Sequence, residues 1–203
     1  MRRIVTEINR QKPDLILSAG DFVNGHSDKT SLPIEEIAME LAKAQAKYEF
    51  YTVLGNHDSW YGKEQVTKAP ESNTIKILSN SNAKIRVGQK AFYIAGVEDL
   101  TTGEPIVRKV LDGVEQPGIL LTHNPDIFLE IPDSVNLILA GHTHGGQVVL
   151  PLVRALIVPS KKKYAQGMIE ENGRKMFVTR GIGTSIFPIR FNCKPEIVVI
   201  EFE

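Results

Sequence analysis

The stretch that most constrains this 203-residue chain is Gly141-His142-Thr143-His144-Gly145-Gly146-Gln147. It follows the apolar run Leu137 to Ala140, which has the length and composition of a buried strand. In an extended chain, residues i and i+2 point the same way, so we expect His142 and His144 to address one shared centre. The glycines around them permit close backbone approach and unusual dihedral angles. The segment therefore predicts a ligand-binding turn at the end of a strand.

Three other apolar runs end in residues of the same kind. They are Leu15 to Leu17 before Gly20-Asp21, Tyr51 to Leu54 before Gly55-Asn56-His57-Asp58, and Gly118 to Leu121 before His123. Open α/β sheets bind ligands outside the carboxyl ends of their strands, where loops converge above a rigid scaffold. Four of the five histidines directly follow one of these strands, whereas His26 lies in a polar loop and is interpreted as a surface residue. The pattern predicts an α/β fold with potential metal ligands at its strand ends.

The remaining elements complete a single α/β domain over residues 1–203. We expect helices from the start of the chain to Arg10, from Pro33 to Lys47 and from Pro105 to Leu111, a hairpin of Lys84 to Val87 with Ala91 to Gly96, and strands at Val148 to Leu150, Lys175 to Val178 and Ile197 to Phe202. The last three strands suggest a second sheet. A hydrophobic content of 42% is enough for one full core, and no linker divides the chain.

Composition excludes several classes of function. With 24 basic and 24 acidic residues, the chain lacks the global positive field that attracts nucleic acid or anionic lipid, and Lys161 to Lys163 is interpreted as a solvated turn. The single cysteine, Cys193, excludes an intrachain disulfide framework and fits a reducing compartment. The start does not form a signal peptide, and the longest apolar stretch, Val148 to Val158, falls short of the roughly 20 residues of a membrane helix. As written, the chain is expected to be soluble and cytoplasmic.

The ordered motifs resemble those of the calcineurin-like metallophosphoesterase family. They are Gly20-Asp21, Gly55-Asn56-His57-Asp58, His123 and Gly141-His142-Thr143-His144. The resemblance implies a four-layer α/β/β/α sandwich and two divalent metals bridged by Asp21. One metal centre would be completed by Asn56, His123 and His142, and the other would include His144.

The resemblance also implies a catalytic pair, in which His57 faces the substrate as a general acid or phosphate-oxygen donor and Asp58 orients it. Oxygen and imidazole ligands without thiolates suit manganese, iron, zinc or cobalt. Two metals about 3.5–4 Å apart can clamp a phosphoryl group while a metal-activated hydroxide attacks in line. We expect hydrolysis of a phosphodiester or pyrophosphate, rather than a monoester, in a phosphorylated small molecule or a lipid-linked substrate.

The closing stretch Thr179 to Ser185, with the residues that follow it, resembles a bacterial branch of membrane-associated phosphoesterases. Arg180 and Arg190 are candidates for gripping the substrate phosphate, because arginine forms paired hydrogen bonds to such groups, but they can equally be surface residues. Membrane association would be expected only through an N-terminal segment that this sequence does not contain.

The sequence departs from the family because no Asp-x-His occurs ahead of Asp21. One metal site therefore lacks two ligands, only the other has its full proposed set, and the fold is expected to lack its first strand. Three explanations compete: an N-terminally incomplete sequence, which we favour, a protein that works with one metal, or a degenerate relative that no longer catalyses. The alternative function is a non-catalytic metal-binding or interaction module of the same fold.

Overall fold

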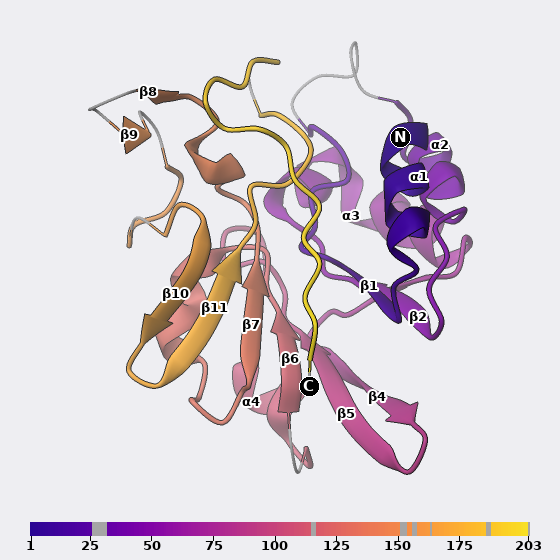
Figure 1. Cartoon of the computed structure of the whole chain (residues 1–203), viewed down its shortest axis with the longest axis vertical. Helices are drawn as coiled ribbons and strands as arrows, with labels where there is room; N and C mark the ends of the chain where they lie inside the picture. The colour runs from indigo at the N-terminus through magenta and orange to yellow at the C-terminus, as the bar shows by residue number, and fades with distance from the viewer. Residues whose placement is uncertain are drawn as a thin grey trace.

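The computed structural model describes residues 1–25, 32–114, 117–150, 154–155, 158–162, 164–185 and 188–202. The predictions made for His26 and Lys163 lie outside these residues. In chain order the elements are α1 (Arg2–Gln11), β1 (Leu15–Ser18), α2 (Ile34–Leu41), β2 (Glu49–Thr52), α3 (Asn56–Glu71), β3 (Ile75–Ile77), β4 (Ser81–Val87), β5 (Lys90–Gly96), α4 (Val107–Leu111), β6 (Pro117–Leu121), η1 (Pro125–Glu130), β7 (Leu137–Ala140), η2 (His144–Gly146), β8 (Val149–Leu150), β9 (Arg154–Ala155), β10 (Gly167–Glu171) and β11 (Arg174–Val178) (Figure 1).

Two main sheets organise the chain, which confirms the α/β class. Sheet A has the order β1-β2-β3 and is parallel throughout. Sheet B has the order β10-β11-β7-β6-β5-β4 and is mixed, with a parallel centre and an antiparallel hairpin at each side. The four predicted strands that end in ligand-type residues are β1, β2, β6 and β7. They are divided equally between the two sheets.

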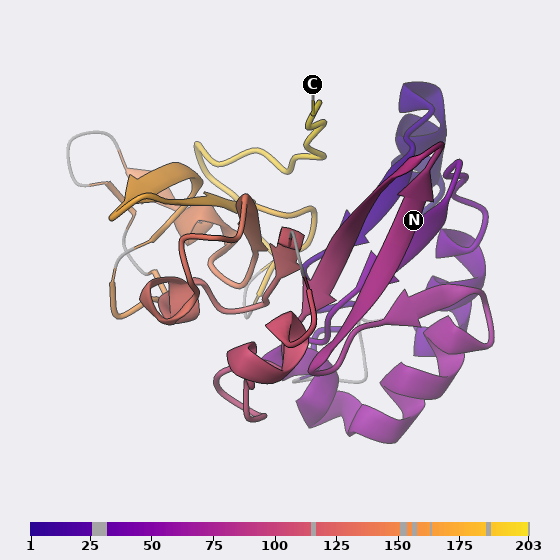
Figure 2. The same ribbon diagram turned by 90° about the horizontal axis from the view of Figure 1, so that it is seen from below.

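Three apolar cores separate successive layers of the molecule. Helices α1, α2 and α3 cover the outer face of sheet A, where Ile16 and Phe50 are buried, and Figure 2 shows these helices on the side away from sheet B. A second core lies between the sheets and includes Tyr51 and Leu121. The third core joins the far face of sheet B to α4 and η1, with Phe128 fully buried. Neighbours such as Phe50 and Tyr51 face different cores because successive strand side chains alternate between faces.

Several sequence predictions are confirmed with altered bounds. The N-terminal helix, the β4–β5 hairpin and α4 form where expected, but α2 ends at Leu41 instead of reaching Lys47. The backbone N–H of Lys47 donates to the Pro13 carbonyl and that of Tyr48 to the Asp14 carbonyl, which leads the chain into β2 and leaves no room for further helical turns. None of the helices in the described chain combines the length and apolarity that crossing a bilayer requires.

Two predictions about the C-terminal part are wrong. In the described ranges, the strands after Gln147 do not form one common sheet, because β11 pairs with β7 inside sheet B, while β8 pairs with β9 in a separate two-stranded sheet. The segment Ile197 to Phe202 is not a strand. An extended segment becomes a strand only when a neighbour supplies a hydrogen-bond ladder, and within the described ranges no ladder includes these residues.

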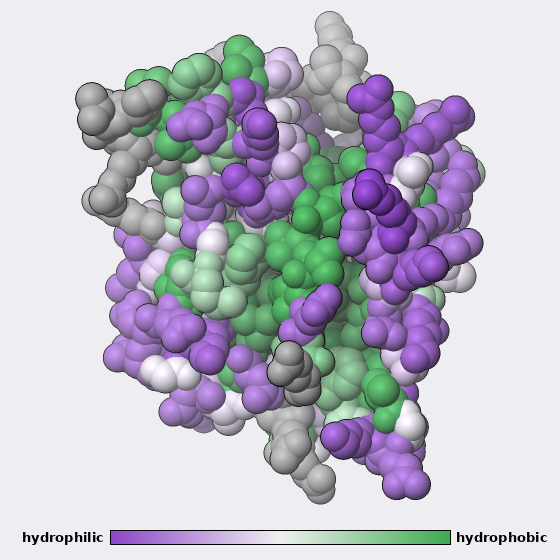
Figure 3. Space-filling view, in the orientation of Figure 1, coloured by the Kyte–Doolittle hydropathy of each residue, from purple (hydrophilic) through white to green (hydrophobic). Residues whose placement is uncertain are grey.

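The C-terminal segment consequently leaves apolar side chains at the surface. Val199 is 59% exposed and Phe202 is 63% exposed. In Figure 1 this segment runs down the face of the molecule between the two main sheets, and Figure 3 shows apolar surface gathered along the centre of the same face. The chain thus carries exposed apolar surface along the centre of this face.

Candidate metal centre

The carboxyl ends of β1, β2, β6 and β7 bring polar atoms together around one nitrogen, Nε2 of His123. Asp21 Oδ2 lies 3.1 Å from it, and Asn56 Oδ1 and His142 Nδ1 each lie 3.1 Å from it as well. The ligand atoms of Asp21, His123 and His142 all lie within 4.8 Å of one another. Four of the predicted site residues therefore meet in space, although they come from both sheets.

The chemistry of this cluster calls for a positive charge at its middle. Nδ1 of His123 lies 2.6 Å from the Ala19 carbonyl oxygen, which can only accept, so Nδ1 carries the hydrogen and Nε2 of the neutral ring presents a lone pair. Oxygens of Asp21 and Asn56 face that lone pair and would repel it unless a cation lies between them. Burial lowers the pKa of His123, but the charge of Asp21 and the hydrogen bonds outweigh burial and raise it to about 9. The donor set fits a divalent cation, which would take the place of the proton that this raised pKa favours on Nε2.

Two glycines allow the loops to come this close. A Cβ on Gly55 would lie 2.1 Å from Asp21 Oδ1 and 2.7 Å from His123 Cε1, inside the space of the cluster. Gly20 has φ +91°, and a Cβ there would lie 2.6 Å from the Gly55 nitrogen. The glycines of Gly-Asp and Gly-Asn-His-Asp are therefore needed sterically, because any side chain would separate the two loops.

Asp58 joins the loop after β1 to the start of α3. Its Oδ2 accepts from the backbone N–H groups of Asp21 at 2.8 Å and Gly55 at 3.0 Å, and its Oδ1 accepts from that of Phe22 at 2.8 Å. Burial, reinforced by the charge of Asp21, raises the pKa of Asp58 to about 7 against the opposing effect of these bonds. The carboxylate of Asp58 thus holds the backbone of these two segments together. This role differs from the expected one of orienting His57.

The His57 ring is oriented by the backbone. Its Nδ1 contacts the carbonyl oxygen of Asn24, and the edge of Trp60 packs on the ring at a centroid distance of 5.0 Å. Because a carbonyl only accepts, Nδ1 carries the hydrogen in the neutral ring. Nε2 is then the ring nitrogen that would face the substrate, and it lies 3.5 Å from Ser185 Oγ. The His57 backbone N–H donates to Asp21 Oδ1 at 3.0 Å, which ties this residue to the cluster.

The turn that carries His142 and His144 is not extended, so the reasoning that placed both side chains on one face is wrong. His142 has φ 67° and His144 has φ 51°, both in the left-handed region, and His144–Gly146 forms the short helix η2. His142 joins the cluster around His123. Among the residues that the structure describes, His144 lies outside that cluster.

The surroundings of His144 also differ from those of His142. Burial lowers the pKa of the His144 ring, the charge of Asp21 opposes this and Arg190 adds to it, so the pKa falls to about 4. The His144 carbonyl accepts from Arg190 Nη1 at 3.3 Å and from Cys193 Sγ at 3.2 Å. The segment that follows Pro188 therefore contacts the backbone of this part of the turn.

Both candidate phosphate-gripping arginines bind the protein itself. Arg190 donates from Nη2 to the Arg180 carbonyl at 2.7 Å and from Nε to the Gly183 carbonyl at 2.8 Å, and it also reaches the Gly181 carbonyl. Arg180 forms an ion pair with Glu196, whose Oε2 accepts from Nε at 2.7 Å. The two guanidinium groups fold the segment around Gly181 and Gly183, which argues against the role in gripping phosphate.

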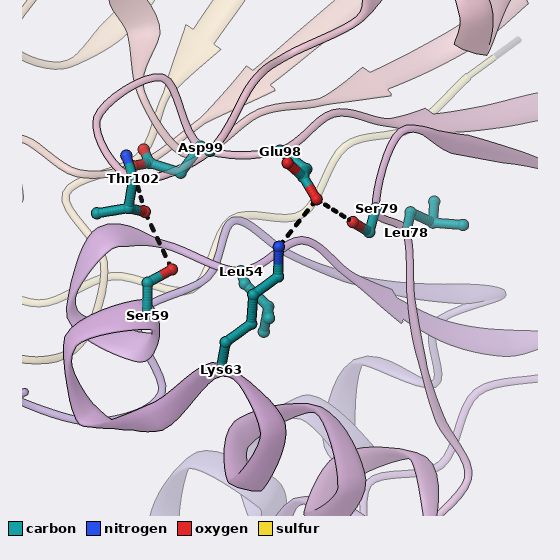
Figure 4. A pocket seen from close by; sticks show the side chains of 9 residues that line it. Leu54, Ser59, Lys63, Leu78, Ser79, Glu98, Asp99 and Thr102 are labelled. Carbon is teal, nitrogen blue, oxygen red and sulfur yellow. Dashed lines mark hydrogen bonds and ion pairs between the residues drawn. The ribbon is translucent and has the colours of Figure 1, made fainter.

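A small cavity of about 20 Å³ lies between α3 and the loop after β5 (Figure 4). Glu98 crosses it, accepting from Lys63 Nζ at 3.0 Å and Ser79 Oγ at 2.8 Å. Asp99, in the cavity wall, is 4% exposed, and its charge raises the pKa of His123. The volume suits one water molecule, so this cavity is too small for a substrate.

Sequence reasoning missed several residues that shape the centre. Ala19 and Asn24 act through backbone carbonyls, which no side-chain pattern can signal. Asp99 belongs to no motif that the sequence analysis singled out, and Ser185 ends the stretch Thr179 to Ser185 without a role of its own being assigned to it. The position of Gln147 at the end of the histidine turn was the only available signal for its contact with Ser185.

Solved structures share this fold. The NAD nucleotidase of Haemophilus influenzae superposes with a TM-score of 0.61 at 21% identity, over 89% of this chain and 43% of that one. A 5'-nucleotidase precursor of Thermus thermophilus superposes with a TM-score of 0.53 at 16% identity, over 87% of this chain and 42% of that one. The chain thus spans less than half of either structure, and the likeness concerns the fold alone.

Known sequences establish the family. The uncharacterized metallophosphoesterase YkuE of Bacillus subtilis is 32% identical over 205 residues, covering 98% of this chain and 71% of that protein. Phosphodiesterase YaeI of Escherichia coli is 32% identical over 196 residues, covering 94% of this chain and 71% of that protein. The calcineurin-like phosphoesterase family matches residues 1–146. The chain therefore belongs to the calcineurin-like phosphoesterases, a family of metal-dependent phosphohydrolases.

Proposed function

We propose that this chain hydrolyses phosphoester bonds at a divalent metal held by Asp21, Asn56, His123 and His142. The observation that carries the proposal is the convergence of three polar atoms at 3.1 Å on His123 Nε2, while the other ring nitrogen is committed to a backbone carbonyl. Manganese, iron, zinc and cobalt all suit this mixture of imidazole and oxygen ligands. The relative named as a phosphodiesterase favours a diester over a monoester.

The chain's own residues divide the work. When bound, the metal supplies an activated water and neutralises charge on the phosphoryl group. Ala19 fixes the tautomer of the ligand His123, and Asn24 fixes that of His57. His57, once protonated at Nε2, would donate a hydrogen bond to a phosphoryl oxygen and a proton to the leaving group. Asp58 keeps the loops that carry Asp21 and His57 together.

Three finer features belong to the same proposal. The apolar cores between helices, sheet A, sheet B and helices support a four-layer sandwich as the complete fold. His144 would serve a second metal centre. The substrate would be a phosphorylated small molecule or a lipid-linked compound.

A second candidate function is a non-catalytic metal-binding module. The observation that favours it is that, among the described residues, the metal-ligand cluster contains Asp21, His123 and His142 but not His144. This module would bind one metal tightly without cleaving phosphoesters.

Metal stoichiometry together with turnover separates the two candidates. The chain is loaded with Mn²⁺, the bound metal is counted by mass spectrometry, and hydrolysis of bis-p-nitrophenyl phosphate is followed. Metal-dependent turnover that disappears in His123→Ala supports the hydrolase. One tightly bound metal without turnover supports the module, and no bound metal contradicts both.

A further inference from the structure

The hydroxyl of Ser185 lies close to Nε2 of His57. The two residues are 128 positions apart in sequence, and Ser185 Oγ lies 3.5 Å from His57 Nε2. That separation is long for a direct hydrogen bond between a hydroxyl and a ring nitrogen. It is short enough for both groups to reach one oxygen atom at the usual distance of about 2.8 Å. The pair therefore has the geometry of two groups that can contact the same oxygen atom.

Gln147 fixes Ser185 at this position through a reciprocal pair of hydrogen bonds. The Ser185 backbone N–H donates to Gln147 Oε1 at 2.8 Å, and Gln147 Nε2 donates to the Ser185 carbonyl at 3.1 Å. Gln147 directly follows the turn that carries His142 and His144. The serine is thus attached to the element that supplies a proposed metal ligand, so its distance from the metal centre is set by the same turn.

Arg190 binds the rest of the segment Arg180 to Ser185, which we call the serine loop. Its guanidinium binds the backbone carbonyls of Arg180, Gly181 and Gly183, and it also binds that of His144. One side chain therefore fastens the serine loop and the histidine turn to each other. These bonds and the Gln147 pair use backbone atoms of the loop, and none of them uses the Ser185 hydroxyl. The loop would keep its shape without that hydroxyl.

From this geometry we propose that Ser185 is a substrate-binding residue whose hydroxyl donates to a non-bridging phosphoryl oxygen that His57 also contacts. The proposal rests on the proposed function, because it takes the ligand of the site to be a phosphoryl group. An anionic phosphoryl oxygen is a strong acceptor for the Ser185 hydroxyl. A loop held by these hydrogen bonds presents the hydroxyl at a smaller ordering cost when the substrate binds.

The test compares Ser185→Ala with Thr184→Ala, which removes a hydroxyl from the adjacent residue. Binding of inorganic phosphate to the Mn²⁺-loaded chain is measured by calorimetry, and KM and kcat are measured with bis-p-nitrophenyl phosphate. A hydrogen bond to a charged group predicts that Ser185→Ala raises the phosphate Kd and the KM about tenfold or more. Manganese content and the melting temperature should stay at the parent values, and Thr184→Ala should match the parent throughout.

A second variant, Gln147→Leu, keeps the Ser185 hydroxyl but removes the two hydrogen bonds that hold the Ser185 backbone. It therefore separates the effect of where the hydroxyl lies from the effect of its presence. It should weaken phosphate binding as Ser185→Ala does, and the double variant should be no weaker than Ser185→Ala alone. An unchanged phosphate Kd in Ser185→Ala overturns the proposal even where turnover is normal, and so does a parent chain that binds no phosphate. Weakened phosphate binding in a chain without turnover would instead retain the Ser185 site and overturn hydrolysis.

Discussion

The region around His123 and the region around His144 meet at one turn, yet their electrostatics are opposite. Beside His123, the carboxylate of Asp21 more than offsets burial, and the pKa of the ring rises to about 9. At His144, burial outweighs the opposing charge of Asp21, and with the added effect of Arg190 the pKa falls to about 4. The charge of Asp21 acts on both rings, but it outweighs burial only at His123, which Asp21 contacts directly. The comparison teaches that direct contact with the carboxylate decides the direction of the pKa shift of a buried histidine.

The largest expected effect is on metal affinity. Asp21→Asn keeps the shape of the side chain but removes the negative charge, so the Kd for Mn²⁺ measured by calorimetry should rise by about 100-fold or more. His144→Asn is the matched variant in the other region, and it should raise the same Kd by less than about tenfold. Equal losses in both variants would break the comparison.

A large kinetic effect is expected at His57. His57→Ala should lower kcat by about 10² to 10⁴ because a general acid is removed, while the bound manganese stays nearly constant. Turnover of bis-p-nitrophenyl phosphate and metal counting on the same sample check this. Loss of metal together with kcat would make His57 a ligand and enlarge the first region.

A steric effect on stability is expected at Gly55. Gly55→Ala places a Cβ against Asp21 Oδ1 and His123, so denaturant unfolding should show a loss of about 1–3 kcal/mol, with weaker metal binding. Gly88→Ala is the control, since a Cβ there meets nothing within 4 Å and only its φ of +62° opposes the change. That control should cost about 1–2 kcal/mol and leave metal binding intact. Intact metal binding in Gly55→Ala would show that the loops can separate without harm.

The smallest effect on stability is expected at the ion pair between Glu196 and Arg180. Glu196→Gln weakens the ion pair with Arg180, which is partly exposed, so unfolding should be easier by about 1 kcal/mol or less. Burial raises the pKa of Glu196, but its bonds to Arg180 lower it below the ordinary 4.5. The contribution is therefore present above pH 4.5 and is lost as the pH falls further, so parent and variant should converge in acid. A difference that grows in acid would contradict this assignment.

The ligand residues could be predicted because strand ends converge in α/β folds. Asp21, Asn56, His123 and His142 meet as expected, even though their strands belong to two sheets. The division between sheets was not predictable, because a short apolar run such as that of β6 has the same composition in either layer. The start of α3 was missed for a related reason, since Gly55 to Asp58 consists of residues that favour turns.

Other features of the site have no sequence signal. The carbonyls of Ala19 and Asn24 select histidine tautomers through backbone atoms that every residue possesses. The positive φ of His142 depends on the surrounding glycines and contacts, so the histidine spacing by itself suggested an extended chain. The segment Ile197 to Phe202 has the composition of a strand, but composition does not supply a pairing partner.

The position of β1 at the border of sheet A has a consequence for handling the protein. In the part of the chain that the structure describes, one side of β1 has no ladder, and apolar side chains such as Val199 and Phe202 are exposed at the surface. An unpaired strand edge is a template for other extended chains, so association should increase with protein concentration. Light scattering across a dilution series would register it as a rise in apparent mass. A dilute sample should then remain monodisperse for longer than a concentrated one.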